Sequence, residues 1–194
     1  KHDDSSFARD VWLFEGGEHR RLTAFGATRR PGVTPDQDDN IRALLASETP
    51  AVAIFGKSWI LHVREVMNNT PEENLNMIGE SVAYCKEQDK EVIYDAEHFF
   101  DGYKDNPEYA VQTLMAAVDA EADFLVLCDT NGGTLPHEVE TITRSVRQAI
   151  SSHTGDEKSF KLGIHTHNDC GMAEANSIAA VNRGAVMVHG TING

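Results

Sequence analysis

Long apolar runs, paired cysteines and an excess of basic residues are all missing from this sequence of 194 residues. Its longest apolar stretches, such as 51–55 and 124–128, fall far short of the roughly 18 residues that indicate a membrane-spanning helix, so we expect no membrane contact. The three cysteines, Cys85, Cys128 and Cys170, are odd in number and widely spaced, which argues against a disulfide framework. The start of the chain has no apolar core of a secretory signal. The expected location is therefore a reducing cytoplasm.

Basic residues are the scarcer charge, because 17 Lys and Arg stand against 31 Asp and Glu, which gives a formal net charge of −14. A surface that binds nucleic-acid phosphates needs clustered Lys and Arg, so we expect no nucleic-acid partner. An anionic substrate would need a locally positive site, such as a bound cation. Hydrophobic residues at 40% and charged residues at 25% are typical of a folded globular domain.

Short apolar segments alternate with longer stretches of helical periodicity along the chain. These segments are 22–26, 51–56, 91–95, 124–129, 162–167 and 185–190. Because they are mostly continuous rather than alternating, they predict parallel strands that are covered on both faces. Helices are predicted to begin at a capping box over 70–73, at 106–108 and at 135–136, each with a proline near the start, and a last helix is predicted over 173–181. The pattern is a series of βα units.

Polar side chains end most of these predicted strands. They are Lys57, Glu97, Asp129 with Thr130, His165 with His167, and Asn193. A doubly wound sheet and a barrel both give βα repeats, but only in a barrel do all strand ends face one mouth. The pattern therefore favours an α/β fold of the TIM (βα)8 barrel type, with 1–194 as a single domain that is shorter than the ~250 residues of a complete barrel.

The segment His165-Thr166-His167 carries the strongest chemical signal. Residues two apart in a strand point the same way, so the two imidazoles project together and Thr166 faces the other side. A strand end with merely solvated or packed histidines is the alternative. The apolar run before the pair and the Asn168-Asp169 that follows favour a divalent metal site, for Mg, Mn, Co or Zn. Such an ion acts as a Lewis acid and polarises a carbonyl group.

Two further strand ends are weaker candidates. Glu97 follows a strand and is suited to bind a substrate or to transfer a proton, although a capping or surface acid is an equal alternative. The segment 129–133 ends in two glycines, which either let backbone amides approach an anion or form a plain loop.

Several motifs together resemble one family of enzymes. They are GIHTHND at 163–169, ANSIAAV at 175–181 and GTING at 190–194, with FGATRR at 25–30, IFGKSW at 54–59, YDAEHFFDGY at 94–103 and CDTNGGTLP at 128–136. This set is similar to the 2-isopropylmalate, homocitrate and citramalate synthases, and the strand ends are most similar to the citramalate synthases. The resemblance runs from about residue 22 to residue 194.

The resemblance implies a role for each matching residue. His165 and His167 match the metal ligands, Glu97 matches a catalytic acid beside the substrate, and Thr130 matches a hydroxyl that binds the carboxylate of a 2-oxo acid. The implied activity is that of an acyltransferase, which condenses acetyl-CoA with pyruvate to give citramalate and CoA. The implied cofactor is a divalent metal, acetyl-CoA is the co-substrate, and the full-length enzyme is expected to be a homodimer.

The sequence also departs from the family's pattern. The family's first strand carries an adjacent Arg and Asp that are not found here, and a further asparagine ligand would lie beyond Gly194, so we expect strands three to eight of the barrel, a fragment without the first two. Smaller departures, at Cys170, Met172, Glu174 and His189, leave the fine substrate preference open but not the metal site. Alternatives to pyruvate are the acceptors of 2-isopropylmalate or homocitrate synthases, and a catalytically inert barrel fragment is the alternative of another class.

Overall fold

A parallel sheet organises the protein, for which a computed structural model describes residues 22–156 and 159–191. Its strands are β1 (Thr23–Ala27), β2 (Ala51–Lys57), β3 (Glu91–Glu97), β4 (Phe124–Asp129), β5 (Leu162–Thr166) and β6 (Ala185–His189). All six predicted strands are confirmed, with ends that differ by at most two residues. The predictions for the chain start and for Asn193 lie outside the described residues.

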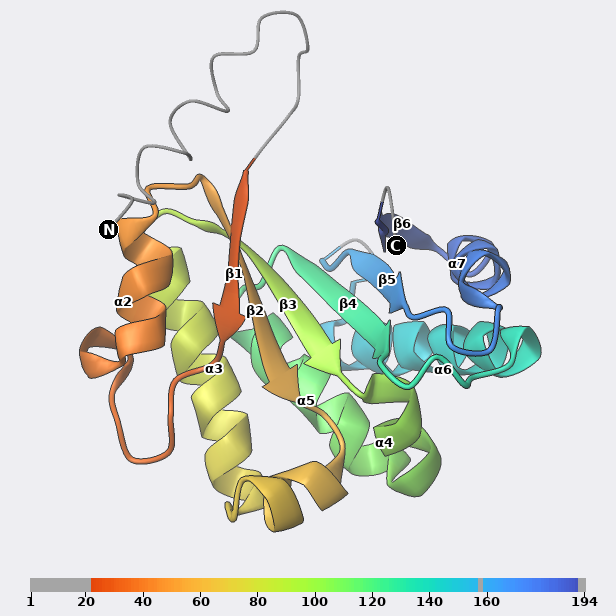
Figure 1. Cartoon of the computed structure of the whole chain (residues 1–194), viewed down its shortest axis with the longest axis horizontal. Coiled ribbons are helices and arrows are strands. Elements are labelled where there is room, and N and C mark those ends of the chain that lie inside the picture. The colour runs from red at the N-terminus through yellow and green to blue at the C-terminus, as the bar shows by residue number, and fades with distance from the viewer. Residues whose placement is uncertain (1–21, 157–158, 192–194) are drawn as a thin grey trace, which may run out of the picture.

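The strands pair in the order β1-β2-β3-β4-β5-β6, and every pair is parallel (Figure 1). A doubly wound sheet would reverse its order at a switch point, whereas consecutive barrel units follow one another as they do here. The expected α/β barrel architecture is therefore confirmed for the described strands, which form part of a barrel. All their carboxyl ends lie at one rim.

Helices connect the strands. They are α2 (Asp39–Ala46), α3 (Pro71–Glu87), α4 (Phe99–Asp105), α5 (Pro107–Asp119), α6 (Pro136–Thr154) and α7 (Ala173–Val181), with a 3-10 turn η1 (Pro35–Gln37) and a π-helical turn η2 (His62–Val66). Within the part of the chain that the structure describes, none of these helices combines the length and the apolar character needed to cross a bilayer.

The predicted capping box of α3 is only half formed. The hydroxyl of Thr70 accepts a hydrogen bond from the backbone N–H of Glu73 at 3.1 Å, as expected. The carboxylate of Glu73 does not return to Thr70, because it binds the buried guanidinium of Arg29 at 2.8 Å. The N–H of Thr70 donates instead to the side-chain oxygen of Asn69.

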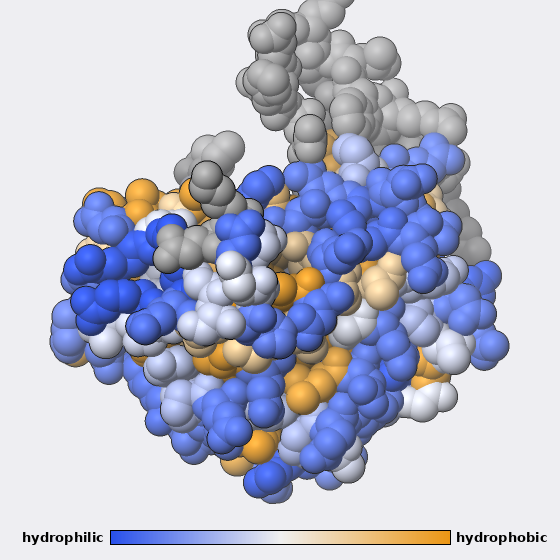
Figure 2. All heavy atoms as spheres, turned by 180° about the vertical axis from the view of Figure 1, so that it is seen from behind, coloured by the Kyte–Doolittle hydropathy of each residue, from blue (hydrophilic) through white to orange (hydrophobic). Residues whose placement is uncertain are grey.

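The strands separate two apolar cores. Side chains on the outer face of the sheet, such as Ile54, Tyr94 and Leu127, pack with the helices in the large core. Inward-facing Ala53, Ile93, Val126 and Cys128 form a small core on the concave face. The side opposite to the view of Figure 1 is mostly hydrophilic and shows only separate apolar areas (Figure 2).

Candidate functional site

A cavity of about 310 Å³ opens at the carboxyl ends of the strands. It is lined by Phe25, Phe55, Asp95, Glu97, Cys128, Thr130, His165 and His167. All four residues singled out from the sequence, Glu97, Thr130, His165 and His167, border this one cavity. They come from β3, from the turn after β4 and from β5, so the barrel order brings together residues that are far apart in the chain.

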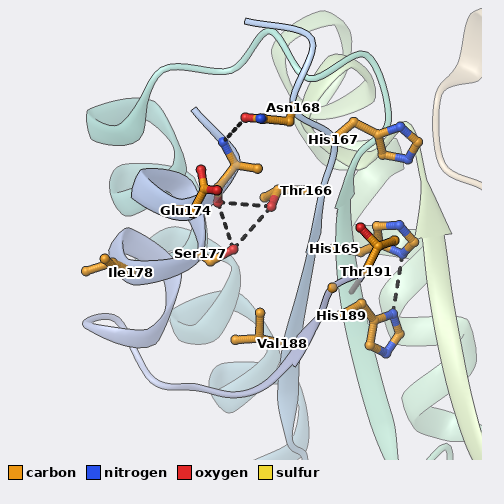
Figure 3. Close-up of a pocket in the computed structure, with 12 residues that line it drawn as sticks. His165, Thr166, His167, Asn168, Glu174, Ser177, Ile178, Val188, His189 and Thr191 are labelled. Atoms are coloured by element: carbon orange, nitrogen blue, oxygen red, sulfur yellow. Dashed lines mark hydrogen bonds between the residues drawn. The ribbon is translucent and has the colours of Figure 1, made fainter. Parts of the chain in front are cut away.

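His165 and His167 point to the same side of β5, as the strand alternation predicts. Their ring centroids are 5.3 Å apart and the rings are nearly parallel, at 16°. Thr166 faces the opposite side, where its hydroxyl contacts the carbonyl of Ala173 and the hydroxyl of Ser177, both at 3.1 Å (Figure 3). Because α7 holds Thr166 in this way, the orientation of β5 is fixed.

His189 joins this group from β6. In the sheet it lies directly beside His165, and the two Nδ1 atoms are 3.3 Å apart (Figure 3). Burial lowers the pKa of His189 from its ordinary value, the carboxylate of Asp95 opposes this by raising it, and the charge of His165 lowers it further. A neutral imidazole, with one nitrogen free to accept a proton or a metal ion, is therefore favoured.

Asp95 lies below the two imidazoles. Its Oδ2 atom is 3.6 Å from Nδ1 of His165 and 3.7 Å from Nδ1 of His189. No sequence pattern singled out Asp95, and His189 stood out only as a departure from a family pattern. One signal was present, because Asp95 lies two residues before Glu97 and so shares its face of β3.

Glu97 and Lys57 form an ion pair at the rim. The two residues are direct register partners across β2 and β3, and the ammonium of Lys57 binds Oε2 of Glu97. Both side chains are about three-quarters buried, with 23% and 24% exposure. The ion pair therefore holds the carboxylate of Glu97 in the cavity wall.

The hydroxyl of Thr130 accepts one hydrogen bond and can still donate another. Its Oγ1 atom accepts a hydrogen bond from the backbone N–H of His98 at 2.8 Å. A hydroxyl has one donor and two acceptor positions, so this contact leaves the O–H free to donate into the cavity.

A buried network holds the turn after β4. The carboxylate of Asp129 accepts hydrogen bonds from the hydroxyl of Thr134 at 2.8 Å and from the amide of Asn176 at 3.3 Å. Gly132 adopts φ +62°, and a Cβ there would lie 2.8 Å from Oδ2 of Asp169. The glycine therefore allows two loops to pack closely, which favours the plain-loop interpretation of this segment over an anion cradle.

Comparisons with known proteins found a matching family model and several similar sequences. The family model described as HMGL-like matches residues 28–194. Proteins named (R)-citramalate synthase match at 42% to 55% identity, and that of Aquifex aeolicus (strain VF5) is 55% identical over 177 residues, which cover 91% of this chain and 32% of that protein. The 2-isopropylmalate synthase of Oceanobacillus iheyensis is 34% identical over 162 residues, or 84% of this chain and 30% of that protein. The chain thus spans about a third of the length of these relatives.

The fold has close structural neighbours as well. The crystal structure of the HMG-CoA lyase of Bacillus subtilis matches with a TM-score of 0.71 at 17% identity, and the match covers 97% of this chain and 58% of that one.

Proposed function

The chain belongs to the HMGL-like family, and from this premise we propose that the protein is an acyltransferase that condenses acetyl-CoA with pyruvate and water to give citramalate and CoA. The observation that carries the proposal is the single cavity bordered by Glu97, Thr130, His165 and His167. The identity to proteins named (R)-citramalate synthase supports the choice of reaction.

We further propose that 1–194 is one catalytic domain and that its strands are strands three to eight of an eight-stranded barrel. The sequential, all-parallel strand order supports this assignment. The homodimer and the cytoplasmic location stay predictions.

His165 and His167 are the residues that we assign to the divalent metal. The donor chemistry fits, because two imidazoles and the carboxylates of Asp95 and Glu97 border one cavity, and imidazole with oxygen donors suits an open site for Zn, Co or Mn. When bound there, the ion supplies Lewis acidity toward the keto oxygen of the acceptor.

Thr130 is assigned to the carboxylate of the 2-oxo acid. Its free O–H donates to the carboxylate while the His98 N–H holds the oxygen in place. A hydrogen bond to a charged group contributes about 1.5–3 kcal/mol, and the contact fixes which end of the acceptor faces the imidazoles.

Glu97 is assigned to proton transfer in the condensation. A base takes a proton from the methyl group of acetyl-CoA, and the resulting carbanion forms a carbon–carbon bond to the keto carbon of pyruvate, whose oxygen takes up a proton and becomes a hydroxyl. Water then cleaves the thioester, which releases citramalate and CoA. Lys57 holds the Glu97 carboxylate at the cavity wall through their ion pair. Glu97 therefore reaches the substrate in a fixed orientation.

An aromatic wall favours a short acceptor. The rings of Phe25 and Phe55 stack with centroids 5.5 Å apart at 24° and border the cavity. These two large rings line a cavity of about 310 Å³, and beside them the methyl group of pyruvate needs less room than a branched or long side chain. The acceptors of 2-isopropylmalate and homocitrate synthases are the second candidates, supported by the weaker identity to 2-isopropylmalate synthases and a homocitrate synthase.

The test is thiol release from acetyl-CoA by the full-length protein, with pyruvate and longer 2-oxo acids compared as acceptors. We expect release that depends on pyruvate and on a divalent metal. Thr130→Val should lower kcat/KM for pyruvate by about 10- to 100-fold through loss of the hydrogen bond to the carboxylate. Thr141→Val is the matched control, because Thr141 is exposed on α6 and its hydroxyl contacts only the helix backbone. No pyruvate-dependent release of CoA, with the metal present, would remove the proposal.

A further inference from the structure

A buried side-chain amide holds the end of β2. The carbonyl of Phe55 accepts a hydrogen bond from the N–H of Thr28 at 3.0 Å, just beyond the last residue of β1. Carbonyls two residues apart in a strand point to the same side, so the carbonyl of Lys57 points past the end of β1. It accepts a hydrogen bond from the amide nitrogen of Asn74 at 2.9 Å instead. Asn74 therefore continues the hydrogen bonding of β2 where the neighbouring strand has ended.

The side chain of Asn74 is itself fixed by its surroundings. Asn74 lies in the first turn of α3 and is 0% exposed. The same amide nitrogen donates to the hydroxyl of Tyr109 on α5 at 2.9 Å, so both of its N–H groups are used. Because buried polar groups are costly to leave unpaired, this one amide ties β2, α3 and α5 together.

Lys57 connects this amide to the cavity. Lys57 and Glu97 are the last register pair of β2 and β3, and the N–H of Ser58 donates to the carbonyl of Glu97 at 3.2 Å. The ammonium of Lys57 binds the carboxylate of Glu97 in the cavity wall. The lysine side chain is long and flexible, so the place of its ammonium depends on how firmly its main chain is held.

We propose that Asn74 is a positioning residue that keeps Lys57 against Glu97 by holding the carbonyl of Lys57. Asn74 is not among the described residues that line the cavity, so it acts on Glu97 through Lys57 alone. The value of this contact for the reaction rests on the proposed role of Glu97 in proton transfer.

The first test follows the ion pair without any measurement of activity. The full-length protein is treated with formaldehyde and borohydride, and the methylation rate of each lysine is followed by peptide mass spectrometry. In Asn74→Leu we expect Lys57 to react about 2- to 5-fold faster than in the wild type, the range that follows from loss of one ion pair. Lys86 is the internal reference, because it forms a similarly exposed ion pair with Asp123 elsewhere on the protein. An unchanged rate at Lys57 overturns the proposal.

The second test measures CoA release from acetyl-CoA with pyruvate. Asn74→Leu should lower kcat by about 10- to 100-fold, the effect of a small misplacement of a reacting group, and leave KM for pyruvate nearly unchanged, because the contact of Thr130 is intact. Val82→Ala is the matched control, since Val82 is fully buried on the same helix and has no polar side-chain atom. An equal loss of kcat in Val82→Ala would attribute the effect to stability and overturn the proposal. Asn74→Ser, which shortens the side chain, replaces Asn74→Leu if the larger residue impairs folding.

A double substitution tests whether Asn74 acts through Lys57. Lys57→Met alone should lower kcat, and Asn74→Leu added to it should cause little further loss, because the ammonium that Asn74 positions is already absent. Fully additive losses would show that Asn74 acts by another route. If the wild-type protein releases no CoA with pyruvate and a divalent metal present, the proposed function fails, whereas the methylation rates still decide whether Asn74 holds Lys57 in place.

Discussion

Replacement of Gly163 by alanine should destabilise the sheet at the floor of the site. Gly163 faces the concave side of β5, and a Cβ atom there would lie 2.9 Å from Cγ2 of Val126 and 3.3 Å from Cβ of Met187. Val126 is fully buried in β4 and, as a β-branched residue, has little freedom to change its rotamer. The Cβ atom and the carbonyl oxygen of Met187, at 3.3 and 3.5 Å, are held by the backbone of β6. One of the strands must therefore move.

The expected cost is about 1–3 kcal/mol, the range found when an extra carbon is forced into a packed core. It is measured as the shift of the urea and thermal unfolding midpoints in the full-length protein. Gly133→Ala is the matched control, because a Cβ at Gly133 meets no atom within 4 Å and its φ is not positive. The control should change the stability by less than about 0.5 kcal/mol.

A double substitution tests the cause. Val126→Ala alone should cost about 2 kcal/mol, because it removes buried carbon atoms. Combined with Gly163→Ala, it also removes the atom that causes the clash, so the double variant should be more stable than the sum of the single effects predicts, by about 1 kcal/mol or more. Additive effects, or a neutral Gly163→Ala, would refute the argument from close packing.

Three further predictions address the network, the charges and the thiols. Asn176→Ala should cost about 1–3 kcal/mol in unfolding free energy, because it removes the side-chain donor from the buried carbonyl of Thr134 and one of the hydrogen bonds to the Asp129 carboxylate, whereas Asn182→Ala on the exposed end of α7 should be nearly neutral. The pKa of Glu73 is lowered from 4.5, mainly by its hydrogen bond to the guanidinium of Arg29. The ion pair of Glu73 and Arg29 therefore stabilises the protein above about pH 4.5 and loses this effect at lower pH. Glu73→Gln should lower the stability by at most about 1 kcal/mol at neutral pH, and this difference should vanish in acid. Native protein should be alkylated quickly at exposed Cys170 and slowly at Cys128, since burial raises the pKa of the latter thiol, and equal rates measured by peptide mass spectrometry would contradict this.

The strands could be predicted because their local signals agree with the tertiary structure. Continuous apolar runs are found where both faces of a strand are covered, and the predicted segments match β2 and β4 closely. The sequence predicted the end of β3 at Asp95, but the strand continues to Glu97. The extension has a physical reason, because Lys57 and Glu97 are register partners and their ion pair continues the strand pairing.

The contact between His165 and His189 depends on a detail that no local pattern encodes. The pairing of β5 with β6 shifts by one residue between Leu162 and Gly163. Without this shift His165 would oppose Val188, and His189 would point to the other face. The position of an irregularity in a sheet follows from packing across several strands, so the contacts among Asp95, His165 and His189 were visible only in three dimensions.

The helix start at Thr70 shows the same limit on a smaller scale. The spacing of Thr70 and Glu73 correctly predicted the N-cap, because that hydrogen bond is local. The same spacing wrongly predicted a hydrogen bond from the backbone of Thr70 to the carboxylate of Glu73, because Arg29, which is far away in the sequence, binds that carboxylate instead.

The division of the interior into two cores also affects how the sequence of such a protein can change during evolution. Most of the apolar packing lies between the sheet and its helices, while only a handful of side chains, including Ala53, Ile93 and Val126, form the concave core beneath the cavity. Exchanges among these few inward positions alter the shape that a ligand meets, yet they leave the larger core intact. New ligand preferences can therefore arise without redesign of the scaffold.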